Sequence, residues 1–115
     1  RLNTMAHLVL TALARVGQGK PATVAALVRV LDGDPLPPVR QAAAQAIGRL
    51  GTEAAPAVDA LVRALRDRDD DVVKAVVWAL GRLGPAARSA RPELEKLRAR
   101  LDLRKAVDET LRQIG

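Results

Sequence analysis

The heptapeptide QAIGRLG at residues 45–51 returns as WALGRLG at residues 78–84, and this recurrence decides the fold. Related endings occur twice more, as LARVG up to Gly17 and as LRQIG up to Gly115. The four terminal glycines follow one another at intervals of 34, 33 and 31 residues. Recurrence at a nearly fixed period of this length is typical of a solenoid, in which similar supersecondary units stack on one another.

Each unit is predicted to form two helices. Before Gly51, apolar residues recur at intervals of three and four, as one face of a helix requires. These residues are Val39, Ala42, Ala43, Ala46, Ile47 and Leu50. Asp34 and the prolines after it predict the start of this helix, and Gly51 predicts its end. Thr52 is then expected to cap a second helix, which ends at Asp67.

The third unit repeats this plan, with Asp71 as the expected cap of its first helix. Its second helix is predicted to begin behind Pro92 and to present three leucines to the core, Leu94, Leu97 and Leu101. Alignment of the units on Pro56 and Pro92 makes the loop between the two helices three residues longer in the third unit. A last helix is predicted over residues 103–114, with a polar outer face that suits the end of a solenoid.

The predicted fold class is therefore all-α: a solenoid of about three antiparallel helix pairs and a C-terminal capping helix. The expected units are 2–33, 34–67, 68–102 and a partial unit at 103–115, all within one domain over residues 1–115. Small residues at Ala14, Gly48 and Gly81 share one position of the repeat, where they are expected to let neighbouring units approach closely.

The first predicted helix carries a broad apolar arc, which includes Met5, Leu8 and Leu10. Because the end of a solenoid needs a polar outer face, we expect further repeats before residue 1, or another chain, to cover this arc. The chain is then expected to be part of a longer one.

Three segments resemble HEAT repeats, in particular the short bacterial variety of phycobilisome lyase-like proteins. They are DPLPPVRQAAAQAIGRLG at 34–51, PAVDALVRALRD at 56–67 and DDVVKAVVWALGRLG at 70–84, and the resemblance extends over residues 5–115. It implies that the first helix of each pair is convex and that the second lines a concave groove where protein ligands dock. It also implies an Asp–Arg ladder between repeats, which Asp34 and Arg40 match, Val73 interrupts and Arg104 resumes.

The composition limits the chemistry of the chain. It has 115 residues, one histidine, no cysteine and no tyrosine, and its only serine is Ser89. A catalytic triad would need Ser89 to meet His7 across the stack, and thiolate metal sites are excluded. The acidic run at 67–71 lacks the spaced oxygens of a calcium loop and is expected to cap a helix instead. We expect no enzymatic activity, no cofactor and no metal.

The net charge of +6 suits an anionic partner, although an arginine-rich and alanine-rich composition produces the same charge without one. A protein partner, such as an acidic peptide or domain, is the primary expectation, and nucleic-acid backbone binding is the alternative. No apolar run approaches the roughly 20 residues that span a bilayer, so no membrane partner is expected. The lack of cysteine suits a reducing compartment, and the expected location is cytoplasmic.

Trp78, the only aromatic residue, is the first candidate for partner binding. It aligns with Thr11, Gln45 and Glu109, so it is expected to be exposed on the convex side. Either it contacts a partner, as tryptophans at interfaces often do, or it lies over Lys74 and Arg82 of its own helix. Arg49 and Arg82 share another position, where a cation is favoured by the end of the helix dipole and a phosphate site is the less favoured interpretation.

The other candidates are arginines of the second helices. Arg29 and Arg63 share a position, with Ala99 as the next equivalent, and Arg66 and Arg98 lie nearby. We expect these four arginines to contact an acidic protein ligand at the rim of the concave groove. Acidic residues, Asp59 and Glu95, share a further position, and a mixed groove fits protein better than nucleic acid.

Overall fold

The structure is a computed structural model and describes residues 20–115. Within this range every regular element is helical. The α-helices are α2 (Pro21–Gly33), α3 (Pro37–Leu50), α4 (Val58–Ala64), α5 (Asp70–Leu83), α6 (Arg91–Leu97) and α7 (Leu101–Ile114), joined by the 3₁₀-helices η1 (Gly51–Ala57) and η2 (Gly84–Ala90). The helix predicted before Gly17 lies outside the described residues, and so does Ala14.

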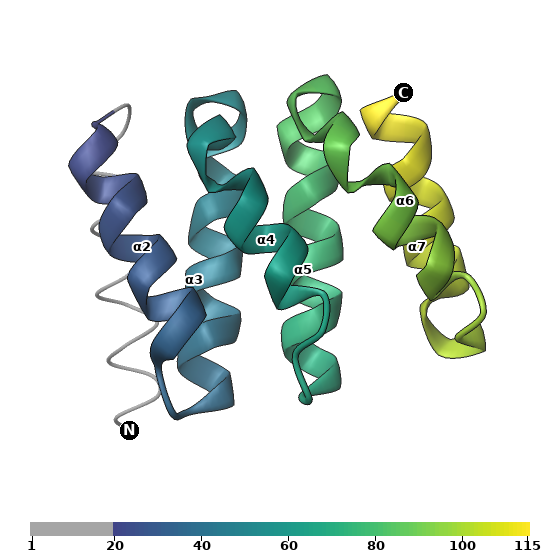
Figure 1. Cartoon of the computed structure of the whole chain (residues 1–115), viewed down its shortest axis with the longest axis horizontal. Coiled ribbons are helices and arrows are strands. Elements are labelled where there is room, and N and C mark those ends of the chain that lie inside the picture. The colour runs from purple at the N-terminus through teal and green to yellow at the C-terminus, as the bar shows by residue number, and fades with distance from the viewer. Residues whose placement is uncertain (1–19) are drawn as a thin grey trace.

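The helices form two layers (Figure 1). One layer, here the first-helix layer, holds α3, α5 and α7; the other, the second-helix layer, holds α2, α4 and α6. Each unit crosses from one layer to the other and returns, so α3 packs beside α5 and α5 beside α7. The all-α solenoid predicted from the repeat is confirmed.

The core between the layers is built from aliphatic side chains that recur with the repeat. Leu27, Leu61 and Leu94 occupy equivalent places in α2, α4 and α6, and each is fully buried. Ile47 and Leu80 do the same in α3 and α5. A single helix pair cannot bury such a stripe alone, so each unit covers the apolar face of its neighbour.

Glycines allow the first helices to approach one another closely. A Cβ atom on Gly48 would meet the indole of Trp78 and would lie 3.1 Å from the Cα of Ala79. A Cβ on Gly81 would meet the side-chain amide of Gln113 and would lie 3.1 Å from the hydroxyl of Thr110. Gly48 and Gly81 therefore hold corresponding places in adjoining repeats, each against the next first helix.

The helix starts differ from the expected ones. Asp69, not Asp71, caps α5: its carboxylate accepts hydrogen bonds from the backbone N–H groups of Asp71 and Val72, at 2.9 and 3.1 Å. The side chain of Asp34 accepts from the N–H of Leu36 at 2.9 Å and so closes the turn before α3, which begins only at Pro37. In both turns, a carboxylate takes the nearest unpaired backbone donors.

Gly51 and Gly84 end the first helices with φ of +62° each, a conformation that favours glycine, as predicted. The chain continues directly as a 3₁₀-helix, so Thr52 does not cap the next helix. Both connecting segments, η1 and η2, have seven residues. The predicted three-residue insertion is therefore wrong, because Pro56 lies inside η1 whereas Pro92 lies inside α6.

The equal lengths of η1 and η2 change the alignment of the second helices. Leu61 matches Leu94, so Arg63 matches Lys96 rather than Ala99. The shortening of the last period occurs instead in the turn between α6 and α7, which spans 98–100 where the preceding turn spans 65–69. Leu101 accordingly begins α7 and is 78% exposed, instead of packing in the core as predicted.

One ion pair ties α3 to the turn that precedes α5. The guanidinium of Arg40 in α3 donates to both carboxylate oxygens of Asp67, at 2.8 and 3.0 Å, and to the backbone carbonyl of Asp34 at 2.7 Å. The two side chains are only 16% and 10% exposed. This hydrogen bonding lowers the pKa of the Asp67 carboxyl and raises the pKa of the Arg40 guanidinium.

The ladder does not continue in the form that was expected. Val73 stands in the position of Arg40 and is fully buried. Arg104 donates to the carbonyl of Arg98 at 2.9 Å, six residues back, as Arg40 does to Asp34. Arg104 therefore resumes the carbonyl contact, but no carboxylate among residues 20–115 pairs with it as Asp67 does with Arg40.

We predict that Gly48→Ala destabilises the fold by about 1–2 kcal/mol, because the rigid indole and the α5 backbone must move and this overpacking outweighs the gain in helix propensity. Gly81→Ala is expected to cost less, since the flexible end of Gln113 can turn away. Urea unfolding of both variants tests this order. Equal or greater stability of Gly48→Ala would contradict the close approach.

Asp67→Asn is expected to reduce the free energy of unfolding at pH 7 by about 1–3 kcal/mol, less than for a fully buried pair. Because the folded-state pKa of Asp67 is depressed, its contribution is present above the unfolded-state pKa of about 3.9 and is lost as pH falls through the folded pKa. The stability difference between variant and wild type should therefore shrink below about pH 4. Glu109→Gln, which removes an exposed pair with Arg112, serves as the control.

Candidate functional site

Two of the four arginines predicted to bind a partner, Arg63 and Arg66, form ion pairs with carboxylates of neighbouring repeats. Arg63 lies 3.1 Å from Asp32, which links α4 to α2. Arg66 lies 3.5 Å from Glu93, which links the turn after α4 to α6. The pKa of Glu93 is lowered, first by the hydrogen bond from Lys96 and further by the charge of Arg66.

The remaining two arginines behave differently. Arg98 lies 2.6 Å from Asp108, which links the last turn to α7. Arg29 is exposed on α2, and no ion-pair partner for it occurs among residues 20–115. The four arginines thus do not form one continuous basic patch.

A shallow depression of about 360 Å³ lies between the C-terminal ends of α2 and α4. Its lining combines residues of both charge signs with two apolar ones: Leu31, Asp32, Arg63, Ala64, Arg66 and Asp67. The structure therefore brings together two of the predicted arginines, Arg63 and Arg66, whereas Arg29 and Arg98 do not line this depression.

Lys96 is the basic residue that the sequence interpretation missed on this layer. It stands in the position of Arg63 and lies 3.1 Å from Glu93, which Arg66 also contacts. An alignment of Leu61 with Leu94, 33 residues later, would have identified Lys96 as the equivalent of Arg63. Buried leucines indicate the register of a helix more directly than prolines do.

Trp78 lies on the opposite layer, on α5, with 44% of its surface exposed. The predicted exposure is confirmed. Of the two contacts expected on its own helix, the one with Arg82 is present: the guanidinium carbon of Arg82 lies 6.0 Å from the centre of the indole. A guanidinium over an aromatic face at this distance is attracted by the ring electrons. The predicted partner-binding residues are therefore divided between two faces.

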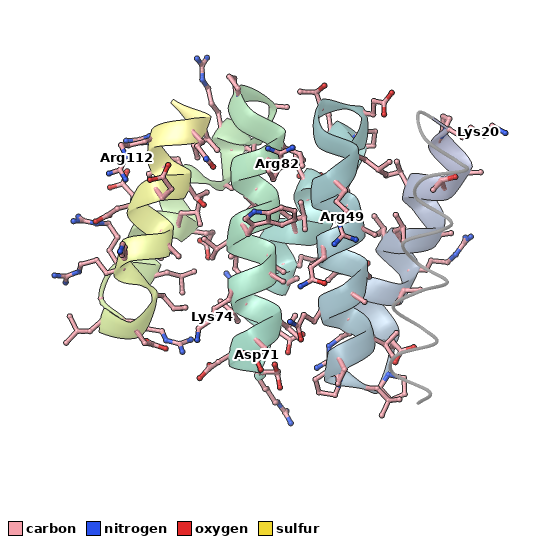
Figure 2. The ribbon with its side chains drawn as sticks, turned by 180° about the vertical axis from the view of Figure 1, so that it is seen from behind. Lys20, Arg49, Asp71, Lys74, Arg82 and Arg112 are labelled. Carbon is pink, nitrogen blue, oxygen red and sulfur yellow. The ribbon has the colours of Figure 1, made fainter. Side chains whose placement is uncertain are left out.

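The surface around Trp78 is hollowed. A depression of about 450 Å³ is lined by Gln45, Arg49, Trp78 and Arg82. A second one, of about 280 Å³, adjoins it and shares two of these residues; its lining is Gln41, Gln45, Asp71, Lys74, Ala75 and Trp78. Figure 2 shows Arg49 and Arg82 on neighbouring helices, with Lys74 and Asp71 nearer the start of α5. We call the two depressions together the Trp78 groove.

The structure also locates the candidate catalytic and metal-ligating residues within its described part. No cluster of three or more His, Cys, Asp or Glu side chains there is placed to hold a metal ion. Ser89 is exposed in η2, and His7 lies outside the described range. From residue 20 onward, no helix is both long enough and apolar enough to cross a membrane.

The acidic run is occupied by structural contacts. Asp67 binds Arg40, Asp69 caps α5, and Asp70 lies 2.8 Å from Arg100. The prediction that this run caps a helix is confirmed for Asp69.

Stacked helix pairs with these connections define an α-solenoid repeat protein. The family model for HEAT repeats matches residues 4–58, and the model for Armadillo/beta-catenin-like repeats matches residues 54–83. Over these residues the chain is thus similar to HEAT-type and Armadillo-type repeats. No curated protein matches it. Repeats of these two types commonly serve as scaffolds that bind protein partners, and their families are generally non-enzymatic.

The arginines beside Trp78 predict unequal quenching of its fluorescence. Because Trp78 is the only tryptophan, all indole emission reports this groove. With each ion's quenching scaled to that of free N-acetyltryptophanamide, iodide should be more effective than caesium at equal ionic strength, since Arg49 and Arg82 raise the local concentration of anions. Arg82→Gln should reduce the iodide constant, whereas Arg88→Gln, an equal loss of charge in η2, should not. Equal scaled quenching by both ions would contradict a positive potential here.

Proposed function

We propose that the chain is a non-catalytic protein-interaction module and that its second-helix layer, which the HEAT resemblance implies is concave, takes a protein partner. The observation that carries this proposal is the depression between α2 and α4, which is lined by the paired Asp32 and Arg63 together with the apolar Leu31 and Ala64. A protein surface presents both charge signs and apolar groups, so it can complement such a lining.

The same contacts argue against a nucleic-acid backbone as the ligand of this layer. Phosphate binding requires cations that neutralise the backbone and release its counterions. Here Arg63, Arg66 and Arg98 already lie beside carboxylates, which a phosphate would have to displace. Bases also bind single-strand sites by stacking on aromatic rings, and the only aromatic residue is on the other layer.

Three further expectations belong to this proposal. The units at 2–33, 34–67, 68–102 and 103–115 act as one repeat domain. The repeats are of the short bacterial, phycobilisome lyase-like type. The protein works in the cytoplasm.

Affinity capture with Arg63→Glu tests the interaction face. This variant places a negative charge beside Asp32 and should lose the partners that wild type retains. Arg112→Glu is the matched control, because Arg112 is an exposed arginine that pairs with Glu109 on the opposite layer. Partners retained by Arg63→Glu, or lost equally from both variants, would contradict the proposed face.

A salt titration of binding to a random-sequence duplex tests the alternative. The proposal predicts no measurable binding near about 150 mM salt. Tight binding that weakens steeply as salt rises would instead assign the basic residues to nucleic acid.

A further inference from the structure

We propose that the Trp78 groove is a second binding site, for a segment of a partner protein in which a large apolar side chain stands between carboxylates. This site lies on the first-helix layer, so it is separate from the proposed second-helix face and stands or falls independently of it. Three features carry the proposal: how the indole is held, which charges surround it, and how the groove continues.

The indole is held across the junction between repeats. Gly48 leaves no side chain where the ring edge lies, and a Cβ there would be 2.9 Å from the Cε3 atom of the ring. The ring therefore packs onto α3 while it remains attached to α5. Since 44% of Trp78 stays exposed, the junction offers an apolar surface to a ligand. A held ring loses little conformational freedom on binding, which is one reason that tryptophan dominates many interfaces.

At one end of the Trp78 groove, the charged residues around the ring are all positive. The larger of the two depressions is lined by Arg49 and Arg82 and by no carboxylate among residues 20–115. This differs from the second-helix depression, where Asp32 and Asp67 accompany the arginines. Guanidinium groups bind carboxylates through paired, charge-assisted hydrogen bonds. An apolar surface bordered by two such groups is complementary to an apolar side chain with a carboxylate next to it.

The groove continues along α3 and α5 away from the arginines. Gln41 and Gln45 line it on the α3 side, and their amides can donate to and accept from an extended peptide backbone. Lys74 lies at this end together with Asp71, so the positive charge falls off along the groove. This polarity favours a segment with its carboxylates concentrated near Arg49 and Arg82. It disfavours a phosphate backbone, which is uniformly charged along its length.

The test uses a synthetic peptide with one leucine between pairs of glutamates, titrated into the full chain while Trp78 emission is recorded and heat is measured by calorimetry. We expect a saturable change in emission and a matching binding isotherm. A peptide with serine for leucine and a peptide with lysine for glutamate should both bind much more weakly. If the serine peptide binds as well as the leucine peptide, attraction is nonspecific and the site is wrong.

Variants separate this site from the rest of the surface. Arg82→Gln and Arg49→Gln should each weaken the peptide about tenfold, as the loss of one charge-assisted contact does. Arg112→Gln, an equal loss of charge on α7, should change the affinity less than twofold. Circular dichroism confirms that each variant keeps its helices.

Three other outcomes would overturn the proposal. If binding survives both groove variants but is lost in Arg63→Glu, the peptide occupies the second-helix face, and the proposed function stands without this site. If light scattering shows a dimer that Arg82→Gln dissociates, a second copy of the chain occupies the groove instead of a partner segment. Absence of heat and of any emission change up to about 1 mM peptide, a weak limit of roughly −4 kcal/mol, would also reject it.

Discussion

The close packing of successive first helices is the constraint on which the rest of the structure depends. At Gly48 and Gly81 one helix comes so near the next that an added methyl group would touch it. This distance is small enough for alanine and valine, rather than large aromatic residues, to fill the space between repeats. It also explains why the core needs no phenylalanine or tyrosine. With the first helices in contact, η1 and η2 can carry the second helices back over the same interface.

The repeat was visible in the sequence because the residues that recur are those that touch between units. Gly48 and Gly81, together with the aliphatic residues around them, pack against the equivalent helix of the next repeat. Because each repeat imposes the same packing restriction, these residues change little from copy to copy. The register of the second helices was harder to find. The sequence alignment placed Pro56 and Pro92 at equivalent positions. A proline is, however, tolerated both inside a 3₁₀ turn and in the first turn of an α-helix. Burial at Leu61 and Leu94 was the decisive constraint.

The candidate surfaces were predictable only in part. Exposure of Trp78 followed from its polar equivalents, whereas its position over Gly48 depends on where α3 lies relative to α5. Pairing of Arg63 with Asp32, or of Arg66 with Glu93, depends on residues 27 to 31 positions apart in sequence. Such pairs appear only after the stacking geometry is known, because several carboxylates are equally distant along the chain. These exposed ion pairs contribute little to the free energy of unfolding, so their residues need not recur from repeat to repeat. The sequence periodicity therefore does not reveal them.

The interruption of the Asp–Arg ladder makes the stack respond unevenly to acid. Between α3 and α5, cohesion includes the sheltered Arg40–Asp67 pair, which protonation of a carboxylate abolishes. Between α5 and α7, Val73 replaces the arginine, and the hydroxyl of Thr110 donates to the carbonyl of Val77 at 2.9 Å. Neither of those contacts titrates, and the Arg100–Asp70 pair there is largely open to solvent. Acidic pH thus weakens the packing between α3 and α5, whereas most of the packing between α5 and α7 is kept.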